Sequence, residues 1–381
     1  MKTVSVPALW MLVALAMATF SPSVAAQGSL RGLQGLTTET EGFDQPDPAR
    51  RLVFPQDHAP HPGFALEWWY LTAVLTGEDG RDYGVQWTLF RVALRPGEAE
   101  DAGWSSPQIW MGHAGLTTPS AHVAAERFAR GGIGQAGVTL PPFRAWIDDW
   151  EMRRPVDAEC PADPCPQDAL DRLQVRAALP EAGAGFTLDL VAEGPLVLHG
   201  AEGFSLKSPD GEASHYYSQP FFRAEGTLIL PEGEIAVSGQ AWLDREWSSR
   251  FLSEAQSGWD WFALFLDSGE RVMGFQVRTR EGPPFTYASW ISADGTVTTA
   301  PPGALRMTPL STAPMPNGAD VPVAWRLEWP ERGLDAEIAA VNPGSWMALS
   351  IPYWEGPVHL RGSHSGRGYL EMTGYIPPEN D

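Results

Sequence analysis

Short turns that combine glycine with acidic or proline residues recur along this 381-residue chain, and they constrain its fold more than any other feature. Each separates two apolar runs of strand length: residues 77–80, 231–233, 267–269, 293–295 and 330–333. Glycine supplies the positive φ that a tight hairpin needs, so each turn predicts a β-hairpin. Hairpins in succession form an antiparallel meander, which we expect to close into barrels or sandwiches because exposed sheet edges promote aggregation. The predicted fold class is therefore all-β.

Long helices have little room in this sequence. It contains 39 glycines and 35 prolines, and both residue types interrupt helices. Residues 121–129 are the best candidate for an amphipathic helix, and the pattern there is marginal. The hydrophobic content of 43% is ample for a packed core, and the length predicts two domains.

One hairpin recurs in the second half of the chain. The aromatic-rich run at residues 68–75 can be laid on residues 260–266, and each run is followed by a glycine turn and a second strand that contains Gly-x-Gln. This pattern favours two related β units in tandem. We place them at residues 51–250 and 251–381.

The N-terminus is typical of an exported protein. A single basic residue, Lys2, precedes an apolar run at residues 8–20 and then the small residues Ala25 and Ala26. This is the pattern of a secretory signal peptide, and the run is shorter than the roughly 20 residues that cross a bilayer. We expect residues 1–26 to be removed, residues 27–50 to form a flexible leader, and the protein to reach the periplasm or the outer face of the membrane.

Net charge limits the classes of partner that the protein can bind, and the cysteines indicate a disulfide. The formal net charge of −21 repels phosphate backbones, so nucleic acid is not an expected partner. The chain has two cysteines, Cys160 and Cys165. In an oxidising compartment we expect them to form a short-loop disulfide.

Cofactor and metal signals are weak. The sequence contains no phosphate-binding loop and no Gly-x-Ser-x-Gly nucleophile elbow, and we expect no cofactor. Asp57, His58 and His61 offer side chains that zinc accepts, but their spacing is not a strong metal signature. We favour a structural role in which the segment that holds them plugs one end of a barrel, and we expect no metal.

One late constellation suggests acid catalysis. Trp242 and Asp244 lie two residues apart in an expected strand and so share a face, as do His215 and Tyr217. If the first pair faces an apolar barrel lumen, burial keeps the Asp244 carboxyl protonated as a general acid. Aromatic faces then stabilise a developing cation, and His215 accepts a proton from water. The alternative is that Asp244 is a solvated charge paired with Arg245.

Five further tryptophans are expected to line an apolar ligand site: Trp68, Trp69, Trp247, Trp259 and Trp261. An apolar ligand gains roughly 25 cal/mol for each Å² that it buries. Glu67, directly before the first of these tryptophans, is expected to be a buried acid that pairs with Arg91 or Arg278.

Several segments resemble the AttH/CrtC-like family, which includes the carotenoid 1,2-hydratases. They follow one another in the same order over nearly the whole chain after residue 50: FPQDHAPHPGFALEWWYLTAVL, HYYSQP, AWLDREWSS, GWDWFALFLDSGERVMGFQVR and GYLEMTGY. The resemblance implies two tandem lipocalin-like (calycin) antiparallel β-barrels, in agreement with the meander and the repeat.

The resemblance also implies a chemistry. The carotenoid hydratases add water to a terminal double bond without a cofactor, and the residues implicated there match His215, Tyr217, Trp242 and Asp244. The aromatic types at positions 217 and 242 are exchanged in this chain, and Arg245 stands where many members have histidine. The AttH-type branch, which this chain resembles more closely, is exported and associated with lipoprotein-release-like transporters.

Three functions follow from these patterns and stay open at this point. The chain is expected to bind an apolar lipid or isoprenoid, or to hydrate a terminal isoprenoid C=C bond with Asp244 as the general acid, or to serve as an accessory protein of an ABC-type export complex.

Overall fold

The computed structural model describes residues 41–97, 103–155, 170–250 and 252–377. The predicted signal peptide, most of the predicted leader and both Cys160 and Cys165 lie outside these residues. Within them, no helix combines the length and the hydropathy that crossing a bilayer requires. The short 3-10 helices are η1 (Gln56–His58), η2 (Gly103–Ser105), η3 (Pro180–Ala182) and η4 (Pro330–Arg332).

The first sheet is antiparallel and holds 13 strands in the described part of the chain, in the order β4-β3-β2-β1-β13-β12-β9-β8-β7-β6-β5, with β10 and β11 paired to β12. Its strands are β1 (Leu66–Gly77), β2 (Asp82–Ala93), β3 (Gln108–Thr117), β4 (His122–Arg130), β5 (Ala136–Thr139), β6 (Arg144–Ile147), β7 (Trp150–Arg153), β8 (Arg172–Leu179), β9 (Ala184–Ala192), β10 (Val197–Leu198), β11 (Phe204–Leu206), β12 (Ala213–Leu230) and β13 (Gly233–Ser248).

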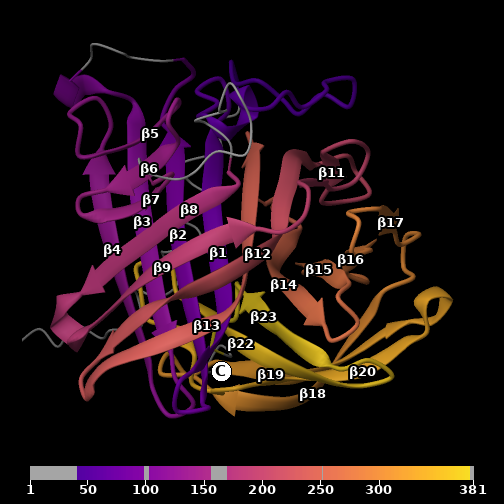
Figure 1. The fold of residues 1–381 in the computed structure, drawn as a ribbon. Coiled ribbons are helices and arrows are strands. Elements are labelled where there is room, and N and C mark those ends of the chain that lie inside the picture. The colour runs from indigo at the N-terminus through magenta and orange to yellow at the C-terminus, as the bar shows by residue number, and fades with distance from the viewer. Residues whose placement is uncertain (1–40, 98–102, 156–169, 251, 378–381) are drawn as a thin grey trace, which may run out of the picture.

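This sheet curls until its two ends meet. Arg127 of β4 forms an ion pair with Asp149, which lies between β6 and β7. The same guanidinium lies 4.3 Å from the ring centroid of Trp150 in β7. These contacts join opposite edges, so the sheet forms a near-closed barrel, seen on the left of Figure 1.

The second sheet is also antiparallel, with ten strands among the described residues in the order β17-β16-β15-β14-β23-β22-β20-β19-β18, and with β21 paired to β22. Its strands are β14 (Gln256–Leu266), β15 (Arg271–Thr279), β16 (Phe285–Ile291), β17 (Val297–Thr299), β18 (Arg306–Pro314), β19 (Asp320–Trp329), β20 (Leu334–Ala340), β21 (Trp346–Met347), β22 (Tyr353–Gly362) and β23 (Gly366–Met372). It forms a half-barrel, coloured orange to yellow in Figure 1. The all-β fold predicted from the turns is confirmed, with the second barrel half formed.

The predicted hairpins occur where the glycine turns placed them. Residues 77–80 join β1 to β2, and residues 267–269 come between β14 and β15. Gly80 and Gly269 have φ angles of 77° and 92°, which is the left-handed region that glycine enters without strain.

The marginal helix candidate at residues 121–129 is strand β4 in the structure. It pairs with β3 along its whole length. Val123, Ala125 and Ala129, at alternate positions, pack against the barrel core, while Phe128 on the other face is exposed. A neighbouring strand edge and a period of two therefore override a marginal helical pattern.

Alternation along β1 divides the molecule into layers. Trp69, Leu71 and Leu75 point into the barrel and belong to its packed core. Tyr70 and Val74, one residue out of step, belong to a different apolar cluster that includes side chains of the second sheet. The half-barrel has a separate core of its own. The outer face of the first barrel thus packs against one face of the second sheet.

A candidate active site between the two sheets

A cavity of about 110 Å³ lies between the two sheets. The barrel contributes Trp68 and Tyr70 of β1, Tyr216 of β12, and Asp244 and Glu246 of β13. The second sheet contributes Trp259 and Trp261 of β14, Phe275 of β15, Tyr353 of β22 and Glu371 of β23. Eight of the twenty lining residues are aromatic, and carboxyl groups from both sheets lie among them.

Strand register explains which residues meet there. In the β1–β13 ladder, Tyr70 is opposite Asp244. In the β12–β13 ladder, Tyr216 is opposite Glu246 and Ser218 is opposite Asp244. Residues directly opposite each other share a face of the sheet, and so do residues two apart on one strand. Three neighbouring strands therefore present these side chains together on the outer face of the barrel.

Asp244 is the most densely hydrogen-bonded acid of the cavity. Tyr216 Oη donates to Asp244 Oδ2 at 2.6 Å, and Trp242 Nε1 donates to Oδ1 at 2.6 Å. The Ser218 hydroxyl also donates to Oδ1. Burial raises the pKa of Asp244 to about 7, although the three donors oppose the rise, and the charge of Glu246 adds to it. The predicted elevation of this pKa is confirmed in direction.

A second pair of buried acids comes from the half-barrel. Glu355 and Glu371 are directly opposite each other in the β22–β23 ladder. Tyr70 Oη donates to Glu355 Oε1 at 2.5 Å, and Trp259 Nε1 donates to Glu371 Oε1 at 3.2 Å. Burial raises the pKa of Glu371 to about 8, and the charges of Asp244 and Glu246 add to the rise. Burial and then the charge of Glu371 hold the pKa of Glu355 well above its usual value.

The mouth of the cavity carries charged pairs. Lys207 Nζ lies 2.9 Å from Glu246 Oε1. The same ammonium lies 4.6 Å from the ring centroid of Tyr216 and 4.4 Å from that of Phe275. Lys207 thus balances one wall carboxylate and makes cation–π contacts with rings on both sheets.

The four predicted catalytic residues do not come together. Asp244 and Trp242 face the cavity side of the sheet, whereas His215 and Tyr217 lie on the opposite face. The His215 ring contacts Trp247, and its Nε2 accepts a hydrogen bond from the backbone N–H of Asp47 at 3.4 Å. His215 and Asp244 therefore do not meet, because the register places Ser218 beside Asp244.

The condition attached to acid catalysis, that Asp244 faces the barrel lumen, is not met. The lumen holds a close-packed apolar core that includes Leu243, the residue before Asp244. Since strand residues alternate, Asp244 points outward, between the two sheets. Neither His215 nor Tyr217 lines the cavity. The pKa of His215 is lowered to about 4, mainly by burial and secondly by the positive charge of Arg50.

The predicted ligand-binding tryptophans divide in the same way. Trp68, Trp259 and Trp261 line the cavity. Trp69 and Trp247 lie on the other side of the first sheet, where the Arg245 guanidinium stacks 3.7 Å from the Trp69 ring centroid and 5.1 Å from that of Trp247. These two residues do not line the cavity.

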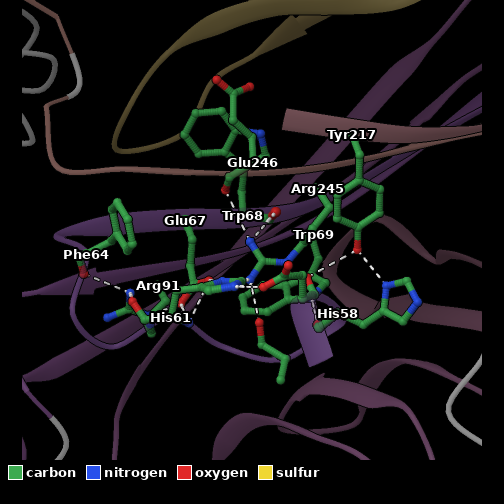
Figure 2. A network of polar contacts seen from close by, with 12 residues as sticks. His58, His61, Phe64, Glu67, Trp68, Trp69, Arg91, Tyr217, Arg245 and Glu246 are labelled. Carbon is green, nitrogen blue, oxygen red and sulfur yellow. Dashed lines mark hydrogen bonds and ion pairs between the residues drawn. The ribbon is translucent and has the colours of Figure 1, made fainter. Parts of the chain in front are cut away.

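A buried ionic network lies on that side of the first sheet, and Figure 2 shows its polar contacts. Glu67 forms ion pairs with both Arg91 and Arg245, and each of the three side chains is at most 1% exposed. Burial alone would raise the pKa of Glu67, but the two guanidinium groups hold it well below its usual value. The predicted pairing with Arg91 is confirmed. Arg278 pairs with Asp260 instead.

The segment before β1 supplies further members of this network. His61 Nε2 lies 3.0 Å from Asp57 Oδ1, and the His61 ring stacks on Trp247 at 3.9 Å. His58 Nδ1 bonds to Tyr217 Oη at 2.7 Å, as Figure 2 shows. These contacts support the structural role predicted for the segment. Among the described residues, no group of three or more His, Cys, Asp or Glu side chains has an arrangement that holds a metal ion.

Several cavity residues escaped prediction from the sequence. Tyr216 and Ser218 alternate with the predicted His215 and Tyr217, so only the pairing register with β13 could have chosen between the two pairs. Glu371 carried a weak signal, because it is an acid within the apolar run GYLEM. Its place in the cavity depends on the packing of one sheet on the other, which the sequence pattern did not reveal.

Comparisons with known proteins agree on the fold. The AttH-like family matches residues 45–375. The crystal structure of a candidate AttH protein from Nitrosomonas europaea is 30% identical, with a TM-score of 0.74, and the match covers 88% of this chain and 100% of that one. No curated protein matches the chain significantly.

Two more distant structures share the fold alone. Kievitone hydratase from Nectria haematococca has a TM-score of 0.62 at 14% identity, over 88% of this chain and 98% of that one. CghA, solved with Sch210972, has a TM-score of 0.51 at 12% identity, over 88% of this chain and 97% of that one. The family match spans most of the chain, and the sequence resemblance is thereby confirmed: this protein belongs to the AttH-like family.

Proposed function

We propose that this protein binds an apolar lipid or isoprenoid in the cavity between its two sheets. The observation that carries the proposal is the lining itself, in which rings from Trp68, Tyr216, Trp259, Trp261 and Phe275 converge from both sheets. Pockets of this kind, apolar with a few placed polar groups, are typical of small-molecule sites.

The acids of the cavity are compatible with an apolar ligand. A buried carboxylate without a partner would be costly beside an alkyl chain. Burial raises the pKa values of Asp244 and Glu371 to about 7 and about 8, so near neutral pH Glu371 is mostly protonated and Asp244 is protonated in about half of the molecules. A neutral acid against an apolar chain carries a much smaller desolvation cost.

The same observation favours alkene hydration as a second candidate. In this reaction the Asp244 proton adds to one carbon of a C=C bond, and the neighbouring carbon becomes a tertiary cation. The faces of Tyr216 and Trp261 stabilise that cation. Water then attacks it, and the surplus proton of that water passes to solvent. The product is an alcohol, and Asp244 is left ionised until it regains a proton.

Purification followed by mass spectrometry of the organic extract tests the binding proposal. We expect the wild-type protein to carry a lipid or isoprenoid in a molar amount comparable to that of the protein. The Trp261→Ala variant should retain several-fold less of this molecule. Nile red, an apolar fluorophore, should bind the stripped protein and be displaced by the extracted molecule. Protein that carries no such molecule and does not bind Nile red contradicts the proposal.

Incubation with an acyclic carotenoid that has a terminal trisubstituted double bond tests hydration. We expect an alcohol one water heavier, with a loss of at least about a hundredfold in rate for Asp244→Asn. The matched control is Asp320→Asn, a change at an exposed position. Equal product from the wild type and Asp244→Asn would remove Asp244 from the reaction.

Export and an association with an ABC-type export complex rest on the sequence alone. Cell fractionation with and without residues 1–26 tests export. Crosslinking in intact cells tests the association.

A further inference from the structure

A chain of five polar side chains runs from Asp244 away from the cavity and into the second sheet. The Ser218 hydroxyl donates to Asp244 Oδ1, and His199 Nε2 lies 2.7 Å from Ser218 Oγ. His199 Nδ1 lies 3.2 Å from Ser289 Oγ, and Tyr287 Oη lies 2.7 Å from the same oxygen. Residues from both sheets therefore form one continuous hydrogen-bonded path.

The local backbone fixes His199 at the centre of this path. His199 directly follows β10, and Gly200 turns the chain there with a φ of 68°. A Cβ atom at position 200 would lie 2.1 Å from the carbonyl oxygen of Phe204, so only glycine fits. The backbone N–H of Gly200 in turn donates to Tyr287 Oη at 2.7 Å.

The far end of the path lies nearest to solvent. His199, Ser218 and Ser289 are fully buried, with 0% exposure, whereas Tyr287 is 7% exposed. Tyr287 is therefore the most exposed member of the path, since Asp244 is 3% exposed, and we take Tyr287 as the entry point for a solvent proton.

When Asp244 is ionised, only one assignment of donors and acceptors satisfies every hydrogen bond along this path. Ser218 has a single hydroxyl hydrogen and gives it to Asp244, so Ser218 must accept from His199 Nε2–H. A neutral imidazole has one N–H, so His199 Nδ1 accepts from Ser289, and Ser289 accepts from Tyr287. When the proton is on Asp244 Oδ1, every bond reverses and His199 carries its hydrogen on Nδ1.

We propose that this path is a proton relay that returns a proton to Asp244 after each turnover, an inference that rests on the hydration activity proposed above. As a solvent proton joins Tyr287, each member passes one hydrogen to the next. Tyr287 gives to Ser289, Ser289 to His199 Nδ1, His199 Nε2 to Ser218, and Ser218 to Asp244. Every intermediate member ends neutral, and Asp244 has gained the one proton that the alkene removed. Before the next turnover the hydroxyl groups rotate and the His199 ring turns over, so that the hydrogens return to their starting order.

The surroundings keep His199 neutral while it relays. Burial and then the positive charge of Lys207 lower the pKa of His199 to about 3. The other titratable groups that face the two ends of the path are few. Those that face Asp244 are Tyr70, Tyr216, Glu246 and Glu371, and those that face His199 are Lys207, Tyr216 and Tyr287. His199 consequently responds to the proton on Asp244 by changing tautomer and not by gaining charge.

Nitrogen NMR of the full-length protein with 15N-labelled histidine tests the relay without any substrate. The His199 signals are assigned by their loss in His199→Gln. In the wild type we expect the ring hydrogen to move from Nε2 to Nδ1 as the pH falls through about 7, with the ring neutral throughout. Ser289→Ala removes the partner of Nδ1, so His199 should then keep its hydrogen on Nε2 over the whole range.

Ser205→Ala is the matched control, because Ser205 is also fully buried and its hydroxyl has no hydrogen-bond partner. It should switch like the wild type. Ser218→Ala breaks the path at its first link and should also abolish the switch, which keeps the test decisive if Ser289→Ala does not fold.

A wild-type His199 that holds one tautomer throughout, or that becomes cationic, overturns the relay. So does a switch that survives in Ser289→Ala. Failure of the proposed function has a different signature, namely no bound lipid, no Nile red binding and no hydration by the wild type.

Discussion

Tyr216 and Tyr217 are consecutive residues of β12, and their hydroxyl groups serve opposite faces of the same sheet. Tyr216 Oη donates to Asp244 in the cavity at 2.6 Å. Tyr217 Oη bonds to His58 Nδ1 at 2.7 Å in the network that closes the barrel end. A single strand thus supplies both the candidate site and its structural support, and neighbouring residues in such a strand should respond differently to mutation.

The neighbouring tryptophans of β1 provide the sharpest test of this division. Trp69 is 1% exposed in the barrel core, so Trp69→Ala should cost about 3–5 kcal/mol of unfolding free energy. Trp68 lines the cavity, so Trp68→Ala should weaken Nile red binding several-fold with a much smaller loss of stability. Denaturant unfolding and fluorescence titration measure the two effects. If the two variants lose stability and binding in equal proportion, the assignment of faces is wrong.

The buried ionic network predicts a large penalty for one small change. Glu67→Gln removes the negative charge that Arg91 and Arg245 share in a fully buried site. Two guanidinium groups are then left without a counter-charge, and we expect a loss of about 3–5 kcal/mol in unfolding free energy.

Glu225→Gln is the control for that variant, because Glu225 pairs with Arg223 on an exposed part of the surface. Exposed pairs contribute about 0–1 kcal/mol. Chemical denaturation at one pH compares the two variants, and similar losses would show that the network adds little to stability.

Asp244 predicts how stability depends on pH. Its pKa is raised in the folded protein to about 7, so the folded state holds a proton that the unfolded state releases above about pH 4. The contribution of Asp244 to the free energy of unfolding is therefore fully present below about pH 4. It is lost as the pH rises to about 7, by at most about 1.4 kcal/mol per pH unit. Asp244→Asn should remove this part of the slope, and Asp320→Asn should keep it. Parallel stability–pH curves for wild type and Asp244→Asn would contradict the raised pKa.

The fold was predictable because its signals are local. A glycine with positive φ, such as Gly80 or Gly269, marks a hairpin wherever it occurs between two apolar runs. The family resemblance then added the tandem arrangement. Alternation also showed correctly that Asp244 and Trp242 share one face.

Only part of the site could be predicted from the sequence. Alternation shows which residues of a strand share a face, but it does not show which part of the molecule that face packs against. Both faces of β12 over residues 213–222 and of β13 over residues 241–248 are buried, one in the barrel and the other under the second sheet. His215 and Ser218 were equally eligible neighbours of Asp244 until the register was known. Contacts between the sheets, such as that of Tyr70 with Glu355, depend on how the two units pack together. The periodicity of a single strand contains no information about that packing.

The carboxyl pair of the half-barrel predicts a coupling that a single variant can expose. Glu371 is opposite Glu355, and its charge helps to hold the pKa of Glu355 well above the usual value. Glu371→Gln removes that charge, so the pKa of Glu355 should fall, although burial still keeps it raised. The infrared C=O band of protonated carboxyls should then lose the contribution of Glu371. The rest of the band, which includes Glu355, should disappear at a lower pH than in the wild type. Glu337→Gln, on an exposed position of β20, should change neither. If the band of the Glu371→Gln variant keeps the wild-type midpoint, the two carboxyls titrate independently.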